Sequence, residues 1–193
     1  MTVGRIAGAA IASVLLLVVA VLIFRRVRND YQTHGKLTPF ASFLEVLIFF
    51  LHGSSSYIFL DSTLAHVNTR SPLFAVAVFC MIVGMGFTLT AMTRLGMRQS
   101  VGGEVTGLRE SGFYRYTRNP QIVAYALAAI GYALLWPSWL GLLWVGLYAA
   151  IAHIMVRTEE EHLQKVYGEA YERYCARTPR YVGPWGRELP LSP

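Results

Sequence analysis

Long apolar stretches are the feature that most constrains how this chain can fold. The first runs from Val3 to Phe24 and consists almost entirely of Ala, Ile, Val and Leu. About 20 consecutive apolar residues suffice to cross the hydrocarbon core of a bilayer. Its apolar core is longer than that of a signal peptide, and arginines follow it instead of preceding it. We therefore expect a retained transmembrane helix at the start of the chain.

Four further apolar stretches follow the first. The expected spans are Phe40–Leu60, Pro72–Met92, Gln121–Leu135 and Leu140–Val156. A short Trp-Pro-Ser-Trp turn separates the last two, so we expect an antiparallel helical hairpin with interfacial tryptophans at its tip. Of the 193 residues 54% are hydrophobic and only 15% are charged, which is typical of a membrane protein. The expected fold is an all-α polytopic membrane protein with about five transmembrane helices.

The Lys and Arg residues are distributed unevenly over the expected loops. With five spans, residues 25–38, 93–118 and the tail from 157 lie on one side and hold 4, 5 and 6 of the 17 Lys and Arg residues. The other side holds only Arg5 and Arg70. By the positive-inside rule the basic side is cytoplasmic, which places the N-terminus outside and the C-terminus in the cytoplasm. Positive charge clustered at membrane ends also argues against a nucleic-acid site.

The chain is expected to form one integrated membrane domain with two regions. Residues 1–92 would be an N-terminal three-helix region, and residues 93–193 would contain a polar loop, the hairpin and a C-terminal helix. Apolar residues at spacings of three and four predict that this last helix runs from about Glu159 to Ala176. Because an isolated helix of this length is marginal in water, we expect it to fold back against the cytoplasmic ends of the spans.

The polar stretch at residues 111–120 leads directly into the fourth expected span. It reads Ser-Gly-Phe-Tyr-Arg-Tyr-Thr-Arg-Asn-Pro. Pro120 suits the first turn of a helix, and Asn119 is a natural N-cap. The N-terminus of a helix carries unpaired N–H groups and attracts anions, and Arg118 adds a positive charge there. An ordinary basic juxtamembrane loop would have the same composition.

Acidic residues follow the fifth expected span, on the same side of the membrane as Arg118. Glu159 and Glu160 could simply form a solvated helical turn. Their expected proximity to Arg118 and Asn119 points instead to a site for a zwitterionic, hydroxyl-rich ligand. Arg118 would pair with a ligand carboxylate, and Glu159 or Glu160 would accept hydrogen bonds from an ammonium group or hydroxyls.

Several ionisable residues lie within or directly beside the expected spans, where burial of charge is costly and often functional. Glu45 is near the cytoplasmic end of the second span and His153 is near that end of the fifth, one turn before Arg157. These three are the candidate catalytic residues, and either Glu45 or His153 could accept a proton. A histidine bonded to a neighbouring helix is the structural alternative for His153. Neither a disulfide nor a metal site is expected from the two cysteines.

With these residues in place, the chain resembles the isoprenylcysteine carboxyl methyltransferase and phospholipid methyltransferase superfamily of integral membrane enzymes. The resemblance covers roughly residues 107–181. Members carry a Gly-x-Tyr-Arg-x-x-Arg-His-Pro-x-Tyr-x-Gly pattern, a helical hairpin, a Glu-Glu pair, spaced tyrosines and a Pro-Arg. The matching residues here are Gly112, Tyr114, Arg115, Arg118, Asn119, Pro120, Glu159, Glu160, Leu163, Tyr167, Gly168, Tyr171, Tyr174, Pro179 and Arg180.

The resemblance implies S-adenosylmethionine as cofactor, bound on the cytoplasmic side, and a lipophilic acceptor that enters from the bilayer. It implies cofactor contacts from Tyr114, Arg118, Asn119, Pro120, Glu159 and Glu160. Asn119 stands where many members have histidine, and it cannot titrate near neutral pH. Ile122 replaces the motif tyrosine and Ala124 the motif glycine. Tyr125, one turn from Ile122, is a candidate to supply the missing ring.

The expected reaction is methyl transfer from S-adenosylmethionine to an O, N or S nucleophile of a small or lipid-like acceptor. Since the methyl group is already activated, the protein chiefly has to align the reactants and exclude water. One alternative is an NADPH-dependent membrane reductase of the sterol or steroid type, which resembles this superfamily at its C-terminal end. The other is a non-enzymatic transporter or scaffold, although no inverted repeat is evident.

Overall fold

The computed structural model describes residues 3–60, 63–95 and 107–183, with only the backbone described for residues 92–95. Every regular element in these ranges is a helix. The elements are α1 (Val3–His34), α2 (Pro39–Ser54), α3 (Ser56–Phe59), η1 (Leu64–His66), α4 (Pro72–Leu95), η2 (Gly112–Arg115), α6 (Pro120–Leu134), α7 (Trp139–Tyr167) and α8 (Glu169–Arg177). The expected all-α polytopic class is confirmed.

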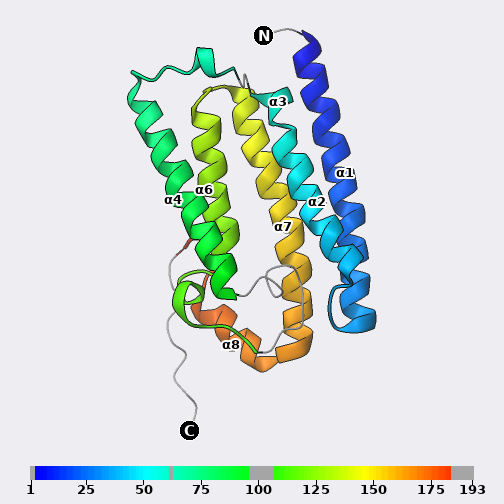
Figure 1. The fold of residues 1–193 in the computed structure, drawn as a ribbon. Helices are drawn as coiled ribbons and strands as arrows, with labels where there is room; N and C mark the ends of the chain where they lie inside the picture. Colours follow the sequence, from blue (N-terminus) through cyan, green and yellow to red (C-terminus); the bar gives the residue numbers. More distant parts are fainter. Residues whose placement is uncertain (1–2, 61–62, 96–106, 184–193) are drawn as a thin grey trace.

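Four of these helical segments are long and apolar enough to cross a membrane, namely α1, α2 together with α3, α4 and α7. The predicted fourth span corresponds to α6, which has only 15 residues. At 1.5 Å per residue this helix is about 22 Å long, shorter than a hydrocarbon core of about 30 Å. It is apolar and runs alongside the longer helices (Figure 1).

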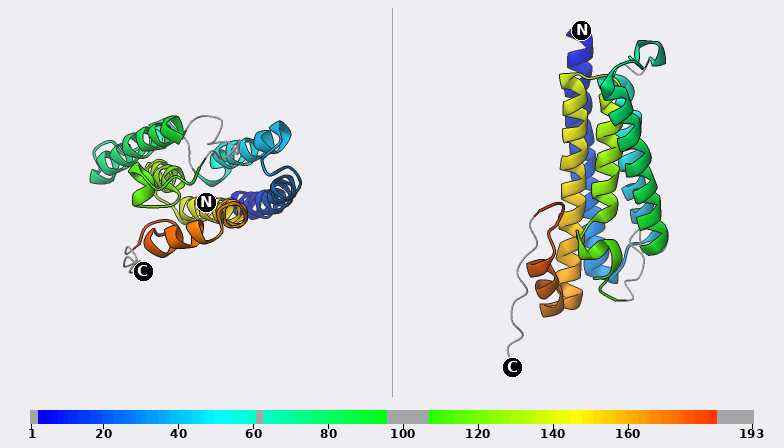
Figure 2. Two further views of the ribbon diagram at one scale, coloured as in Figure 1. Left: turned by 90° about the horizontal axis from the view of Figure 1, so that it is seen from below. Right: turned by 90° about the vertical axis from the view of Figure 1, so that its left-hand side faces the viewer.

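The five longest helices form an open ring. Neighbours pack in the order α4, α6, α7, α1 and α2, so that the hairpin α6–α7 has α4 on one side and α1 on the other. Seen from below, α2 and α4 stand apart at the two ends of this ring (Figure 2). The N-terminal helices therefore flank the C-terminal hairpin on both sides.

The turn from α1 to α2 is organised by the buried carboxylate of Asp30. Its side chain is inaccessible to solvent and forms an ion pair with Arg26 at 3.2 Å. It also accepts hydrogen bonds from the backbone N–H, at 3.1 Å, and the hydroxyl of Thr38. Thr38 in turn caps α2 by accepting from the N–H of Ala41. The prediction of a basic loop over residues 25–38 was wrong, because the helix continues for about three turns beyond the apolar stretch, to His34.

A reciprocal pair of hydrogen bonds joins α2 to α7. His52 is fully buried, and its Nε2 lies 3.0 Å from the carbonyl oxygen of Trp144. Because a carbonyl only accepts, this nitrogen carries the proton. The indole Nε1 of Trp144 donates to the carbonyl of His52 at 3.0 Å, and the two rings stack with centroids 4.6 Å apart. The Nε2 of His52 thus has a structural partner, whereas its buried Nδ1 has no hydrogen-bond partner among the described residues.

The packing of α4 against α6 depends on two glycines. A Cβ atom added at Gly84 would lie 2.5 Å from the backbone nitrogen of Ala128, and one at Gly131 would lie 2.6 Å from the carbonyl oxygen of Ala77. These distances are too short for any side chain. Gly84 therefore allows the close approach of the two helices, whereas a Cβ at Gly86 would meet nothing within 4 Å.

The C-terminal part of the chain differs from the expected arrangement. No separate helix begins at Glu159, because α7 continues unbroken from Trp139 to Tyr167. The chain turns back at Gly168, whose φ of 50° and ψ of −124° suit glycine and little else. The nine-residue α8 follows and packs beside α7. The predicted fold-back therefore occurs, but about nine residues later than expected.

Candidate functional site

The polar segments that the sequence placed on one side of the membrane meet at one end of the bundle. η2, α8 and the C-terminal ends of α1 and α4 all lie at the end opposite the N-terminus (Figure 1). Arg28 of α1 forms an ion pair with Glu161 of α7 at 2.9 Å, which ties the two helices together there. The convergence is therefore a property of the fold.

The centre of this end is a carboxylate held by two arginines. One oxygen of Glu160 lies 3.1 Å from a terminal nitrogen of Arg118, and the other lies 2.7 Å from a terminal nitrogen of Arg180. The Nε of Arg180 also donates to both oxygens, at 3.0 and 2.9 Å. The side chains of Arg118 and Glu160 are each only 12% exposed. Hydrogen bonding to Glu160 raises the pKa of the Arg180 guanidinium, so the group stays charged. We call Arg118, Glu160 and Arg180 the arginine–glutamate cluster.

The residues that open α6 are bonded to the chain that follows α8. The backbone N–H of Arg118 donates to the carbonyl of Pro179 at 3.0 Å. The side-chain amide of Asn119 donates to the carbonyl of Arg180 at 3.0 Å, and the hydroxyl of Thr117 donates to the same oxygen at 3.2 Å. Asn119 does stand at the N-cap position, but its side chain makes no capping hydrogen bond, because it is turned to this distant partner instead.

Tyrosines of α8 support the segment before α6. The hydroxyl of Tyr174 donates to the carbonyl of Tyr114 at 2.7 Å, which holds η2 against α8. A terminal nitrogen of Arg118 also donates to the thiol sulfur of Cys175. Burial raises the pKa of the Tyr114 phenol to about 12, and the negative charge of Glu159 contributes to this shift. Tyr114 therefore stays neutral and can act as a hydrogen-bond donor.

A second group of polar side chains lies on the inner side of α7. Glu159 acts electrostatically on three groups from three different elements, which are Tyr31 of α1, Glu45 of α2 and Tyr114 of η2. Glu45 is only 6% exposed, and its Oε1 has no hydrogen-bond partner among the described residues. We call Tyr31, Glu45 and Glu159 the inner acidic cluster. Two adjacent residues of α7, Glu159 and Glu160, thus serve two different clusters.

The remaining predicted residues lie outside both clusters. The exposed His153 has its Nδ1 3.1 Å from the hydroxyl of Tyr181, and Arg157 is exposed with no ion pair to any described residue. The ring of Tyr125 packs against Tyr148, with centroids 5.1 Å apart. Pro120 is buried as the first residue of α6.

Sequence reasoning missed several residues of the site. Arg180 was recognised as part of a motif but was not assigned to the site. Tyr31 and His162, whose rings stack with centroids 4.1 Å apart, carried no signal. Tyr31 fell in a region expected to be a loop, and only the continuation of α1 carries it to α7. A prediction that residues 25–34 continue the first helix would have placed Tyr31 beside the site.

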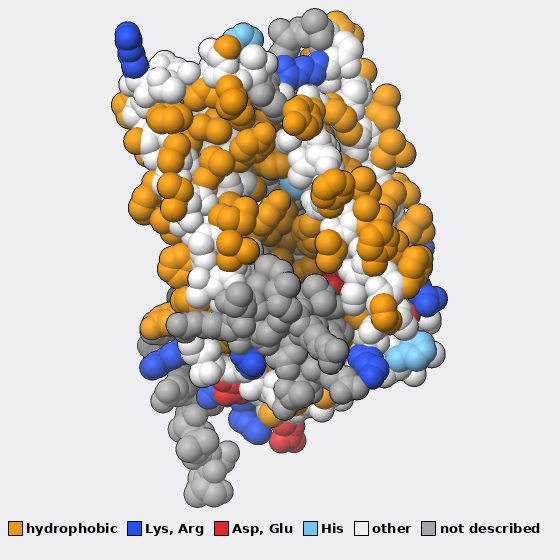
Figure 3. All heavy atoms as spheres, viewed as in Figure 1, with side chains coloured by type: hydrophobic (Ala, Val, Ile, Leu, Met, Phe, Trp, Pro, Cys, Tyr) orange, Lys and Arg blue, Asp and Glu red, His pale blue; other side chains and the backbone are white. Residues whose placement is uncertain are grey.

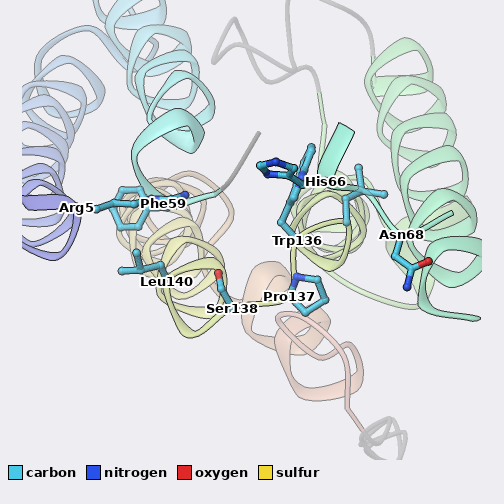
Figure 4. A pocket seen from close by; sticks show the side chains of 9 residues that line it. Arg5, Phe59, His66, Asn68, Trp136, Pro137, Ser138 and Leu140 are labelled. Carbon is cyan, nitrogen blue, oxygen red and sulfur yellow. The ribbon is translucent and has the colours of Figure 1, made fainter. Parts of the chain in front are cut away.

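The surface shows one hollow, and a separate cavity lies at one end of the bundle. The molecule is hollowed between α4 and α2, where hydrophobic side chains form the floor (Figure 3). A cavity of about 350 Å³ lies at the end of the bundle where α6 turns into α7, and Arg5, His66, Trp136 and Ser138 are among the residues around it (Figure 4). None of the predicted site residues lines this cavity.

Comparison with known protein families gave one finding. A family model described as phospholipid methyltransferase matches residues 73–170, about half of the chain. This range reaches from α4 to the start of α8 and contains all predicted site residues except Glu45. Arg180 lies beyond its end. Comparisons with curated proteins and with solved structures gave no significant match.

Proposed function

Because the chain belongs to the phospholipid methyltransferase family, we propose that it transfers the methyl group of S-adenosylmethionine to a lipophilic or small acceptor at the membrane interface. The observation that carries this proposal is the pairing of Arg118 with Glu160 across 3.1 Å. Arg118 lies two residues before α6 and Glu160 lies in the last two turns of α7, and both fall within the matched range. They put a cation and an anion side by side in a largely buried place.

The described residues suit the amino-acid end of S-adenosylmethionine. Arg118 binds the carboxylate, because its Nε is buried and has no hydrogen-bond partner among the described residues. Glu160 accepts from the ammonium group, and Asn119 and Tyr114 donate to other polar atoms of the cofactor. When bound, S-adenosylmethionine supplies a methyl group activated by its sulfonium. The residues of the chain only have to align it with the acceptor and exclude water.

The hollow between α2 and α4 supports access for an acceptor with a hydrocarbon tail. Its floor is hydrophobic, and it opens sideways toward the region where lipid would lie (Figure 3). A carboxylate or thiolate acceptor requires no base. An amine acceptor must lose one proton, and Glu45 and His153 are the candidates to accept it. Of these, Glu45 belongs to the inner acidic cluster and is the buried one.

The family match favours methyl transfer over the reductase alternative, which would require NADPH. Calorimetric titration of detergent-purified protein with S-adenosylmethionine, its demethylated product and NADPH separates the two. We expect binding of the first two ligands. Tight binding of NADPH with none of the methyl donor would establish the reductase instead.

The site residues are tested by the same titration. Glu160→Gln keeps the size of the side chain and removes its charge, and Asn119→Ala removes one donor. Loss of a hydrogen bond to a charged group costs about 1.5–3 kcal/mol, so Glu160→Gln should bind the methyl donor roughly ten- to a hundredfold more weakly. Loss of a neutral hydrogen bond costs about 0.5–1.5 kcal/mol, so Asn119→Ala should bind it up to about tenfold more weakly. Arg118→Gln should behave like Glu160→Gln.

The exposed Lys165 offers a matched control, because Lys165→Gln changes a charge of α7 outside both clusters and should leave the affinity unchanged. Correctly folded variants of Arg118, Asn119 and Glu160 with unaltered affinity would show that the cofactor binds elsewhere.

A further inference from the structure

The chain after α8 runs back over the predicted cofactor residues. We call residues 178–183 the strap. The backbone N–H of Thr178 still bonds to α8, at the carbonyl of Tyr174. From there the strap follows α7 toward the membrane, because Arg180 contacts Glu160 and the next residue, Tyr181, contacts His153 two turns earlier in α7. The strap therefore covers one face of α7.

The strap uses the same polar groups that the proposed function assigns to the cofactor. Asn119 donates its side-chain amide to the strap carbonyl of Arg180. Glu160 receives the guanidinium of Arg180 on both of its oxygens. Arg118 donates its backbone N–H to Pro179. A ligand that bonds to the side chains of Asn119 and Glu160 must therefore take them from the strap.

We propose that the strap is an autoinhibitory element, and that Arg180 occupies the place on Glu160 that the ammonium group of the cofactor takes on binding. This inference rests on the proposed function. The guanidinium of Arg180 and the ammonium group of the cofactor are both cations that donate hydrogen bonds, so they compete for the carboxylate of Glu160. The side chain of Arg180 is 29% exposed, more than twice as exposed as the carboxylate it holds, and can leave into solvent.

The competition lowers the apparent affinity for the cofactor without changing the site itself. A ligand that binds only the open arrangement has an apparent dissociation constant equal to the intrinsic one divided by the open fraction. When the ammonium group of the cofactor replaces Arg180 on Glu160, the number of charged hydrogen bonds to Glu160 stays similar. Displacement of the strap therefore costs little free energy.

Removal of the competing cation tests the proposal. Arg180→Gln should bind S-adenosylhomocysteine, the demethylated product, about tenfold more tightly than the unchanged protein, if the strap is closed in roughly nine of ten molecules. Arg180→Lys keeps a cation and should stay near the unchanged affinity. Arg177→Gln is the matched control, because Arg177 is the last residue of α8, directly before the strap, and pairs with Glu110 instead of Glu160. It should leave the affinity unchanged.

A ligand without the ammonium group sharpens the test. Methylthioadenosine has the same nucleoside and sulfur but lacks the amino-acid end. Its affinity should not respond to Arg180→Gln. An equal gain for methylthioadenosine and S-adenosylhomocysteine would contradict direct competition for Glu160.

Trypsin provides a readout on the unaltered protein. The bond after Arg180 is protected while its side chain is held by Glu160, and the bond after the more exposed Arg177 serves as an internal reference. Saturation with S-adenosylhomocysteine should accelerate cleavage after Arg180 relative to cleavage after Arg177, measured by mass spectrometry. Slower or unchanged cleavage after Arg180 would overturn the proposal.

The failure of this inference differs from that of the proposed function. If the unaltered protein binds S-adenosylhomocysteine but Arg180→Gln binds it equally or more weakly, Arg180 is not a competitor and the methyltransferase proposal still holds. If neither protein binds it, both proposals fail.

Discussion

Two carboxylates with arginine partners, Asp30 and Glu160, have opposite tasks. Asp30 is inaccessible, and its partners Arg26 and Thr38 belong to the same turn of the chain. Glu160 is slightly exposed, and its partners Arg118 and Arg180 come from distant segments. A carboxylate with only local partners holds a turn, whereas one shared between distant segments can exchange a partner.

Replacement of Asp30 should therefore affect stability and not ligand binding. Asp30→Ala leaves the N–H and hydroxyl of Thr38 without their acceptor, and loss of such hydrogen bonds costs roughly 1–3 kcal/mol. We expect a lower midpoint of thermal unfolding in detergent, measured by circular dichroism. Asn29→Ala, at the exposed neighbouring position, is the control and should melt like the unchanged protein. Equal unfolding midpoints for Asp30→Ala and Asn29→Ala would show that Asp30 does not stabilise the α1–α2 turn.

Helices α4 and α6 approach each other so closely that glycine is required at Gly84 and Gly131. Gly84→Ala places a Cβ atom 2.5 Å from a backbone nitrogen of α6, so the helices must separate. Overpacking of this kind typically costs about 1–3 kcal/mol. We expect a lower yield of folded, monodisperse protein in size-exclusion chromatography.

Gly86→Ala is the matched control for this variant, since it is two residues away on the same helix and its Cβ would meet nothing within 4 Å. It should be neutral or slightly stabilising, because alanine favours a helix over glycine. If Gly84→Ala purified as well as Gly86→Ala, the two helices would not be held at this distance.

The sequence predicted the parts of the helices that consist of long apolar stretches. It did not predict the parts that continue into polar sequence beyond those stretches. The sequence indicated both the hairpin and its turn. It did not indicate that α1 reaches His34 or that α7 reaches Tyr167, because polar residues beyond the membrane continue a helix without any hydrophobic signal. Gly168 was read as a motif residue, yet its backbone conformation ends α7.

At the scale of the whole molecule, the sequence indicated which segments share an end of the bundle. The convergence of Arg118 with Glu160 followed from the number of spans and the charge of the loops. The partners of Asn119 and Arg118 in the strap could not be foreseen, since hydrogen bonds between residues about 60 positions apart leave no pattern in one sequence. The Pro-Arg motif was the sole indication of the strap.

The orientation in the membrane stays a prediction. The basic end should face the cytoplasm, because 15 of the 17 Lys and Arg residues belong to the segments expected there. In a background with Cys80→Ser and Cys175→Ser, single cysteines at the exposed positions Ala65 and Ser111 should react from opposite sides of sealed vesicles. An impermeant maleimide that labelled both from one side would contradict the five-span topology.

The open ring has a mechanical consequence. The hydrophobic floor between α2 and α4 must be covered in a bilayer, and hydrocarbon chains are the material available there. We therefore expect lipid to close the gap between α2 and α4, so that the lateral pressure of the membrane would act on the spacing of these two helices. The stability of the protein should therefore depend on the detergent or lipid in which it is measured. The packing of the acyl chains should also influence the conformation of the protein.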